Sequence, residues 1–262
     1  MKLSRLKVIV FTPVALLLLL YITGAAMLAL KNDSIPVFDG PLTSYKEIAV
    51  LGASGTAGDG ILKAALASNE ISTIHVITRR TTPRIEAGIT AGKILMTLHT
   101  DYLDYSAVQS QLKDVDAVYW AIGISSIGVD EETYRKIHVD FPARFIAQWI
   151  GVSRKPETSF HFVSSSDLSE DSSAMWVREK IRAERTLFEI ARGTNLKVIA
   201  YRPDYIGPTQ EEAHIGQNLL YWFFAPVGAA VRAQQIGQAM FEVTARGREF
   251  DNGAKITTRS II

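Results

Sequence analysis

The chain has 262 residues, of which 47% are hydrophobic and none is cysteine, and its 28 Lys and Arg nearly balance its 27 Asp and Glu. The absence of cysteine excludes a disulfide-stapled scaffold and any thiolate-bound metal site. The near-neutral charge argues against nucleic acid as a partner, and the apolar fraction suffices for a folded core. The length corresponds to one large domain or two small ones.

The N-terminal segment is unlike the rest of the chain. Residues 8–30 contain no charged side chain, and residues 16–20 at their centre are all leucine. As a helix this stretch would be about 34 Å long, enough to cross a hydrocarbon core of about 30 Å. We therefore expect residues 1–30 to be a membrane anchor. The alternatives are a signal peptide cleaved near Gly24 and Ala26, and a buried core helix.

After the apolar segment, residues 31–45 are rich in proline, glycine and polar side chains and predict a linker. From residue 46 onward, short apolar runs alternate with segments of helical spacing. The expected strands are 47–52, 73–78, 93–98, 117–122, 159–163, 196–201 and a final edge strand at 255–262. The expected helices are 60–68, 105–113, 131–150, 174–192 and 235–245. This alternation predicts that residues 46–262 form an α/β domain with a doubly wound, Rossmann-type parallel sheet.

A glycine-rich turn connects the first expected strand to the first expected helix, with the spacing Gly-x-x-Gly-x-x-Gly. Residues without a Cβ permit a tight turn and let a pyrophosphate approach the main-chain N–H groups at the helix N-terminus. The position between strand and helix favours a dinucleotide site over a purely structural turn or a relict site. The cofactor-binding residues predicted here are Gly52, Ser54, Gly55, Thr56, Ala57 and Gly58.

The end of the second strand indicates which dinucleotide binds. NAD sites usually place an acidic residue there for the ribose 2′-hydroxyl. This chain has Arg79 and Arg80 instead, and no acid before Glu86. Guanidinium groups pair well with a 2′-phosphate, so the sequence favours NADP over NAD. The alternative is that the two arginines are a solvated loop pair.

In their order along the chain, these features resemble the short-chain dehydrogenase/reductase superfamily, and more closely its atypical NAD(P)-binding branch with NmrA-like and Tat-interacting-protein-like members. The resemblance covers residues 46 to about 260. It implies two catalytic residues: Ser165, a serine after the fifth strand, and Lys180, the lysine of a Tyr-x-x-x-Lys motif. It also implies that Lys180 holds the ribose. It further implies cofactor contacts at the strand ends for Asp101, Tyr102, Ala121, Ile122, Gly123 and Pro203.

One departure from the family pattern concerns catalysis. Trp176 stands where the motif has its tyrosine, four residues before Lys180. In the family this tyrosine exchanges a proton as hydride moves, while the serine orients the substrate carbonyl. An indole N–H only donates and cannot shuttle a proton at neutral pH. The candidates for a substitute acid are Tyr134, Tyr205 and His214.

Several of these residues also have simpler interpretations. Lys180 could pair with Glu184 on a solvated helix face, and Ser165 could be a turn residue. The five histidines lack metal-ligand spacing, so no metal is expected, and His75 and His161 are expected to be buried in strands.

The C-terminal region, from about residue 204, corresponds to the part of the family that forms the substrate pocket. Residues 219–227 are strongly apolar and aromatic. They could form a lid or lipophilic pocket, a patch against a membrane, or ordinary core.

These sequence features are compatible with two functions. One is an oxidoreductase acting on a small carbonyl or alcohol substrate. The other is a non-catalytic dinucleotide-binding redox sensor or assembly protein. Three cations before the apolar segment and one after it favour a domain outside the cytoplasm. Because free dinucleotides are mainly intracellular, we expect the cytoplasmic face instead. The sequence leaves the oligomeric state open.

Overall fold

The computed structural model describes residues 2–30 and 41–261, so all of the predicted linker except 41–45 lies outside the described residues. The domain is built on a seven-stranded sheet with the order β3-β2-β1-β4-β5-β6-β9, in which every pair of neighbours is parallel. Its strands are β1 (Glu47–Leu51), β2 (Thr73–Thr78), β3 (Ile94–Leu98), β4 (Ala117–Trp120), β5 (Thr158–Val163), β6 (Leu196–Arg202) and β9 (Lys255–Thr257). The strand order reverses at β1, which confirms the predicted doubly wound sheet.

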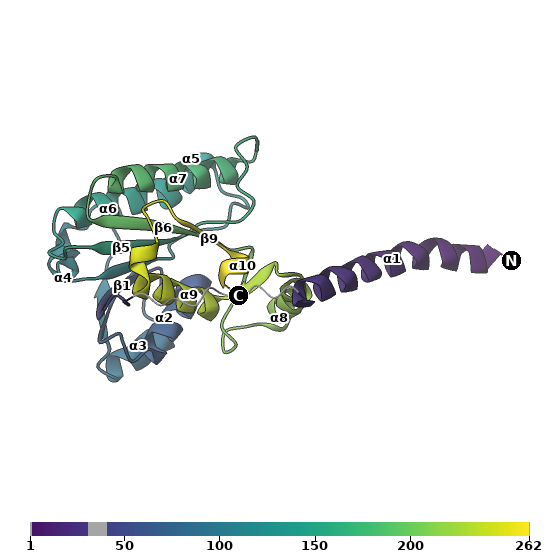
Figure 1. Cartoon of the computed structure of the whole chain (residues 1–262), viewed down its shortest axis with the longest axis horizontal. Coiled ribbons are helices and arrows are strands. Elements are labelled where there is room, and N and C mark those ends of the chain that lie inside the picture. Colours follow the sequence, from purple (N-terminus) through teal and green to yellow (C-terminus); the bar gives the residue numbers. More distant parts are fainter. Residues whose placement is uncertain (1, 31–40, 262) are drawn as a thin grey trace.

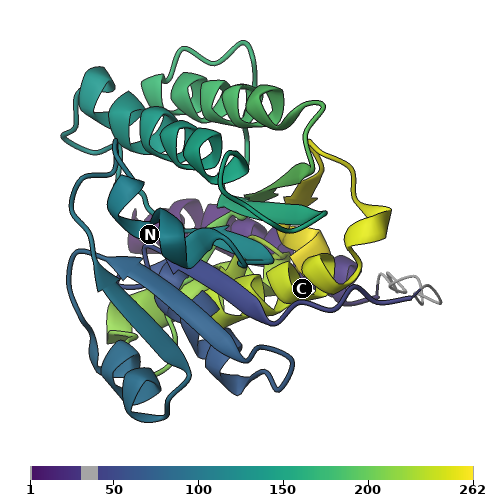
Figure 2. The same ribbon diagram turned by 90° about the vertical axis from the view of Figure 1, so that its left-hand side faces the viewer.

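Helices cover both faces of the sheet (Figure 2). One layer contains α2 (Thr56–Ala67), α3 (Pro83–Thr90) and α9 (Ala233–Ala245), and the other contains α4 (Gln109–Leu112), α6 (Phe141–Ile150) and α7 (Met175–Ala191). Alternate residues of β1 serve the two layers: Ile48 and Val50 belong to the first core, and Ala49 and Leu51 to the second. Because both faces are buried, the central strands are apolar throughout.

Two glycines bring α2 and α9 unusually close together. A Cβ on Gly60 would lie 2.2 Å from the backbone of Ala233, and one on Gly237 would lie 2.8 Å from Ile61 Cα. The two backbones therefore pack against each other directly. This contact holds the C-terminal part of the chain against the first helix of the sheet.

The predicted helix over residues 131–150 is present but not regular. It consists of α5 (Glu131–Arg135), a π-helical segment η2 (Lys136–Asp140) and α6. Pro142 has no N–H to donate, and the Phe141 N–H bonds the carbonyl of Lys136 five residues back. A proline that cannot continue the α-helical ladder accounts for the wider turn before it.

Two other sequence predictions need correction. Residues 105–113 form a 3₁₀ turn, η1 (Ser106–Val108), followed by the single turn α4, instead of one helix. The edge strand expected at 255–262 ends at Thr257 and continues as α10 (Thr258–Ile261). There the Thr258 hydroxyl accepts a hydrogen bond from the Asp204 N–H, which ties the chain back to the end of β6.

The sequence analysis did not anticipate several short elements. Helix α3 begins after Thr82, whose hydroxyl accepts from the Ile85 N–H, and Pro83 occupies its first turn. The C-terminal region adds a two-stranded parallel sheet of β7 (Tyr205–Gly207) and β8 (Ala230–Arg232), together with α8 (Ile215–Phe224), η3 (Ala225–Val227) and η4 (Gly247–Glu249).

The N-terminal segment forms one helix, α1 (Lys2–Leu30), which projects from the domain (Figure 1). Within the described residues, no helix combines the length and the apolar character needed to cross a membrane. The anchor predicted at residues 1–30 therefore stays a prediction.

Candidate functional site

In a parallel sheet, the carboxyl ends of all strands lie at one edge, where doubly wound proteins bind ligands. The predicted site residues follow these strand ends: Gly52 follows β1, Arg79 follows β2, Asp101 follows β3, Ala121 follows β4 and Ser165 follows β5. The fold therefore brings segments from over a hundred residues of sequence to one edge of the sheet.

The glycine loop is tight, and two of its glycines are required by the backbone. Gly52 has φ of +86°, and a Cβ on Gly58 would lie 2.0 Å from the Gly52 carbonyl oxygen. The Gly55 N–H donates to that same oxygen at 3.0 Å. At Gly55 the situation differs, because the nearest atom to an added Cβ is 3.5 Å away. Gly52 and Gly58 thus shape the turn, while Gly55 leaves open space beside it.

Helix α2 begins directly after this loop. Its N-cap is Gly55, which has no side chain to satisfy the first N–H groups, and Thr56 and Ala57 form its first turn together with Gly58. An uncapped N-terminus carries partial positive charge and aligned donors. This arrangement suits a phosphate or pyrophosphate group.

The loop after β4 lies against the glycine loop. A Cβ on Gly52 would lie 2.5 Å from the Ala121 carbonyl carbon and 2.7 Å from the Ile122 nitrogen. Gly123, one residue further, would place a Cβ 2.8 Å from the His138 ring. The structure therefore brings the 52–58 and 121–123 segments into direct backbone contact.

A cavity of ≈ 440 Å³ opens beside the glycine loop. Its wall includes Ser54, Gly55, Thr56 and Arg80 on one side and His214 on the other. The Arg80 guanidinium donates to the Ser54 carbonyl oxygen at 3.3 Å, which holds it at the cavity rim. The size falls in the range of small-molecule sites.

Ion pairs hold the C-terminal wall of this cavity in place. Arg84 Nε donates to Asp59 Oδ1 at 2.6 Å, and the Thr209 hydroxyl donates to Asp59 Oδ2 at 2.8 Å. Lys63 Nζ also donates to Glu211 at 2.6 Å. The hydrogen bond between Arg84 and Asp59 raises the pKa of Arg84, so the Arg84 guanidinium is held in this ion pair. Arg80, in contrast, remains exposed.

Asp101 and Tyr102, which follow β3, differ in their exposure. Tyr102 is buried, and its ring contacts those of Tyr105 and Phe141 at centroid distances of 6.4 and 5.4 Å. Burial raises the pKa of Tyr102, and the nearby charge of Arg79 opposes this rise. Asp101 is exposed and accepts the Leu103 N–H at 3.0 Å. Arg79 therefore lies on the Tyr102 side of the site, while Arg80 lies on the cavity side.

Lys180 is buried in α7, contrary to the alternative of a solvated ion pair. Its Nζ donates to the Val163 carbonyl oxygen at 3.2 Å, and it lies 5.3 Å from the centroid of the Phe162 ring. Burial lowers its pKa to about 8, although the charge of Glu184 acts in the opposite direction. The lysine thus points to the end of β5, next to the serine run.

Glu184 has other direct partners. Its carboxylate accepts from Arg202 Nε at 2.9 Å and from the Ser164 hydroxyl at 2.6 Å. Ser165 is partly exposed beside this pair, and Pro203 is buried and accepts the Ser166 N–H at 3.1 Å. The network joins the ends of β5 and β6 to α7, which fixes the backbone around Ser165.

The sequence analysis missed His138, which lies in the π-helical segment. Its Nε2 is 3.2 Å from the amide nitrogen and 3.1 Å from the carbonyl oxygen of Ile124, and its ring lies 4.1 Å from that of Tyr134. Burial and the charge of Lys180 lower its pKa to about 3. No spacing rule pointed to it, because its position depends on the packing of η2 under Gly123.

The residues considered as substitute acids lie in different places. Tyr134 is buried against His138, and burial raises its pKa to about 12. Tyr205 packs against Phe224 in the small sheet, and His214 is at the start of α8, in the cavity wall. Trp176 is half-buried in the first turn of α7. Within the part of the chain that the structure describes, Tyr134 is the only one of the three whose ring contacts a residue close to Lys180, namely His138.

The arrangement of strands, helices and strand-end loops is shared with solved structures. A 3-oxoacyl-[acyl-carrier protein] reductase from Brucella melitensis in complex with NAD superposes with a TM-score of 0.62 at 14% identity, covering 82% of this chain and 96% of that one. The chain has the short-chain dehydrogenase/reductase fold. A short-chain dehydrogenase/reductase from Serratia marcescens (TM-score 0.63, 16% identity) covers 83% of this chain and 97% of its own.

A third structure, an oxidoreductase of the short-chain dehydrogenase/reductase family from Burkholderia thailandensis, has a TM-score of 0.66 at 13% identity, with 82% and 92% of the two chains covered. Neither a family model nor a curated protein matches the sequence. At such low identity the likeness shows the fold alone.

The buried ammonium of Lys180 predicts a pH-dependent stability difference. Below pH 8, Lys180 is charged in both the folded and the unfolded chain, and its burial opposes folding. Between about pH 8 and the ordinary lysine pKa of 10.5, only the unfolded chain keeps the proton. Lys180→Met should therefore be more stable at pH 7 by up to about 3 kcal/mol, from the size of the pKa shift, before any packing change. This advantage should shrink as the pH rises to 10.5.

The measurement is the thermal midpoint of both proteins from pH 7 to 10.5. Lys255→Met, at an exposed position, is the control and should show no such trend. A difference between Lys180→Met and the parent protein that does not vary with pH would contradict the burial of a charged lysine.

Proposed function

We propose that the chain binds a nicotinamide dinucleotide, with the pyrophosphate against the loop from Gly52 to Gly58. The observation that carries the proposal is the combination of this tight loop with the uncapped N-terminus of α2. The space beside Gly55 admits a close ligand, and the helix presents donors and partial positive charge to it. The structure from Brucella melitensis with this fold is a complex with NAD, which also supports the assignment.

The remaining contacts follow from the strand-end residues. Arg80 would pair with a 2′-phosphate, because it lies at the cavity rim, where its guanidinium donates to the Ser54 carbonyl oxygen. Asp101 and Tyr102 would border the adenine, and Ala121 to Gly123 the opposite wall. Lys180 would hold the nicotinamide ribose. This set favours NADP over NAD.

For the reaction, we propose hydride transfer between the dinucleotide and a small carbonyl or alcohol. The bound dinucleotide would supply or accept the hydride. Ser165 would orient the substrate oxygen, and Lys180 would provide positive charge beside it. Trp176 cannot exchange the proton, so another group must do so. Tyr134 is the best-placed candidate. Its ring contacts His138, and burial and the charge of nearby Lys180 lower the pKa of His138.

One residue, Trp176, supports the second function, that of a non-catalytic dinucleotide-binding protein. Trp176 occupies the position of the tyrosine on which carbonyl reduction depends in the family that the sequence resembles. A chain that binds the dinucleotide without catalysis would act as a redox sensor or assembly protein. The atypical, NmrA-like or Tat-interacting-protein-like branch fits this departure, and we propose it as the placement of the chain.

We also propose that α1 attaches the chain to a membrane, with the domain on the cytoplasmic side. The support is the run without charges at residues 8–30 and the exposure of Leu16 to Leu20, which are 56–66% accessible. The cytoplasmic side follows from the proposed cofactor, which is mainly intracellular.

The glycine loop offers a variant that separates binding from folding. In Gly55→Ala, the backbone is extended, with φ of −104°, and the new Cβ meets nothing closer than 3.5 Å. The free energy of unfolding should change by less than about 1 kcal/mol, while NADPH binding weakens at least about tenfold because the methyl group occupies the approach to the phosphates. Titration calorimetry and thermal unfolding measure the two quantities.

The comparison variant is Gly58→Ala, whose Cβ would clash with the Gly52 carbonyl and which should lower stability markedly. If Gly55→Ala bound NADPH as well as the parent chain does, the pyrophosphate would have to lie elsewhere.

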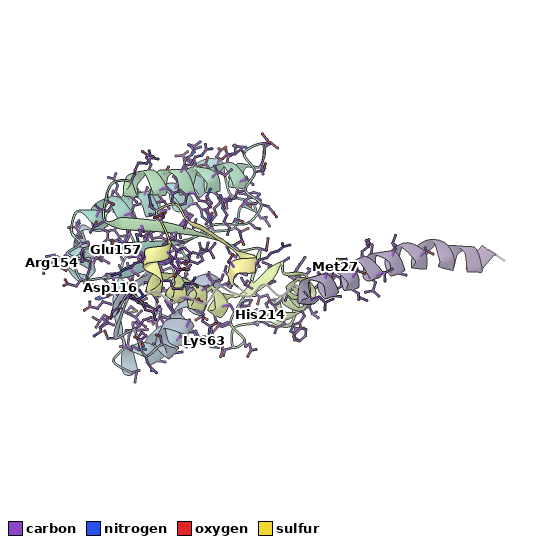
Figure 3. The ribbon with its side chains drawn as sticks, in the orientation of Figure 1. Met27, Lys63, Asp116, Arg154, Glu157 and His214 are labelled. Atoms are coloured by element: carbon purple, nitrogen blue, oxygen red, sulfur yellow. The ribbon has the colours of Figure 1, made fainter. Side chains whose placement is uncertain are left out.

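Arg80 tests the choice between NADP and NAD. Arg80→Ala should weaken NADPH binding about tenfold or more, with little effect on NADH, because only NADPH carries the 2′-phosphate. Arg154→Ala, an exposed arginine far from the cavity, is the matched control (Figure 3). Dissociation constants for both nucleotides would decide. Equal losses for NADPH and NADH would argue against a 2′-phosphate contact.

Trp176→Tyr tests which of the two functions is correct. It restores a phenol one helical turn before Lys180, so a reductase limited by its missing proton donor should gain activity on simple aldehydes and ketones. The assay is NADPH oxidation by the parent chain and the variant, with Trp176→Phe as the control that adds no hydroxyl. Activity of the parent chain that falls in Trp176→Tyr would show that the tryptophan itself serves the native reaction.

A further inference from the structure

Helix α8 exposes its apolar residues and turns its polar ones inward. None of its residues is buried. Its large apolar side chains are accessible to the following extents: Ile215 82%, Leu219 57%, Leu220 47%, Trp222 63% and Phe223 57%. Ile215, Leu219, Trp222 and Phe223 have the spacing of one helix face. A helix that borders water normally shows the opposite distribution.

Polar contacts join α8 to the rest of the domain. Asn218 Oδ1 accepts from Arg232 Nη1 at 3.0 Å. The Arg232 guanidinium also stacks 3.7 Å from the centroid of the Tyr221 ring. These contacts fix the rotation of the helix about its axis. The outward position of the apolar face is therefore determined by specific bonds on the inner side.

The apolar face of α8 continues onto α1. The rings of Tyr21 and Phe223 stack with centroids 5.1 Å apart, and the Tyr21 hydroxyl donates to the Phe223 carbonyl oxygen. Met27 lies at the end of α1 that meets the domain (Figure 3). Met27 is 68% accessible, and the leucines at 16–20 extend the same exposed apolar surface along α1.

We propose that the outer face of α8, formed by Ile215, Leu219, Leu220, Trp222 and Phe223, lies in the interfacial layer of a lipid bilayer. The inference rests on the membrane attachment by α1 proposed above. The contact with α1 selects lipid as the occupant, because a bilayer that surrounds the uncharged run would also border the helix stacked on it. Aromatic residues such as Trp222 are favoured at the depth of the lipid headgroups.

The position of Tyr21 gives this proposal a geometric basis. Tyr21 is nine residues before the end of α1, a distance of about 13 Å along a helix. The exposed leucines at 16–20 lie directly before Tyr21, on the part of α1 beyond its contact with α8. Lipid around these leucines would therefore border the contact with Phe223, and the α8 face would meet the lipid headgroups instead of water.

The test uses the fluorescence of the full chain, which has 4 tryptophans. Trp120 and Trp149 are in the core, Trp176 is half-buried and Trp222 is exposed. The chain is reconstituted into phosphatidylcholine vesicles, either plain or with acyl chains brominated near the headgroup. Bromine quenches only tryptophans in contact with lipid. We expect brominated lipid to reduce the emission of the parent chain, and Trp222→Phe to abolish this reduction.

Trp176→Phe is the matched control and should retain the quenching. Flotation of the same vesicles on a density gradient reports the attachment separately. If the chain floats but its emission is equal in the two lipids, or if Trp222→Phe is still quenched, the α8 proposal is wrong and the attachment by α1 stands. If the chain does not float, both are wrong.

Discussion

The close contact within the turn after β1 is the constraint on which the arrangement of the site depends. Gly58 can lie in the first turn of α2 only because no Cβ separates it from the Gly52 carbonyl oxygen. The same turn places Gly52 against the backbone of Ala121, so the first and fourth strand-end loops form adjacent walls. Any side chain at Gly52 or Gly58 would push α2 away from the sheet edge. The N-terminal donors of the helix would then face a different direction.

A second group of interactions stabilises the ends of β5 and β6. Lys180, Glu184 and Arg202 bring charge into a region where desolvation is costly. The cost is only partly offset: the Glu184 carboxylate has two donors, Arg202 and Ser164, and the lysine has the Val163 carbonyl. The network joins β5, β6 and α7 and thereby positions the serine run. With Trp176 in place of a tyrosine, the lysine and serine have their scaffold but no phenol one helical turn away.

Much of the sheet could be predicted from residue patterns. The central strands are buried on both faces, so runs such as 117–122 are apolar and easy to recognise, and β4 differs from its predicted range only by two residues at its end. The glycine spacing likewise indicated the turn before α2. Elements with weak periodicity were missed, including α3, which is set by the Thr82 cap, and the three-residue strands β7 and β8. Short strands that pair with each other carry no pattern of their own.

The sequence by itself determined the strand order along the chain, the glycine turn and the basic residues after β2, because these depend on local backbone geometry and side-chain type. It also identified residues 219–227 as strongly apolar but left their location open. Only the tertiary structure decided that α8 exposes this apolar face, because Asn218 is bound to Arg232 on the inner side. Likewise, only the packing of η2 placed His138 under Gly123, and only the fold paired Glu184 with Arg202 instead of Lys180. These features depend on which distant segments meet, and local spacing contains no information about that.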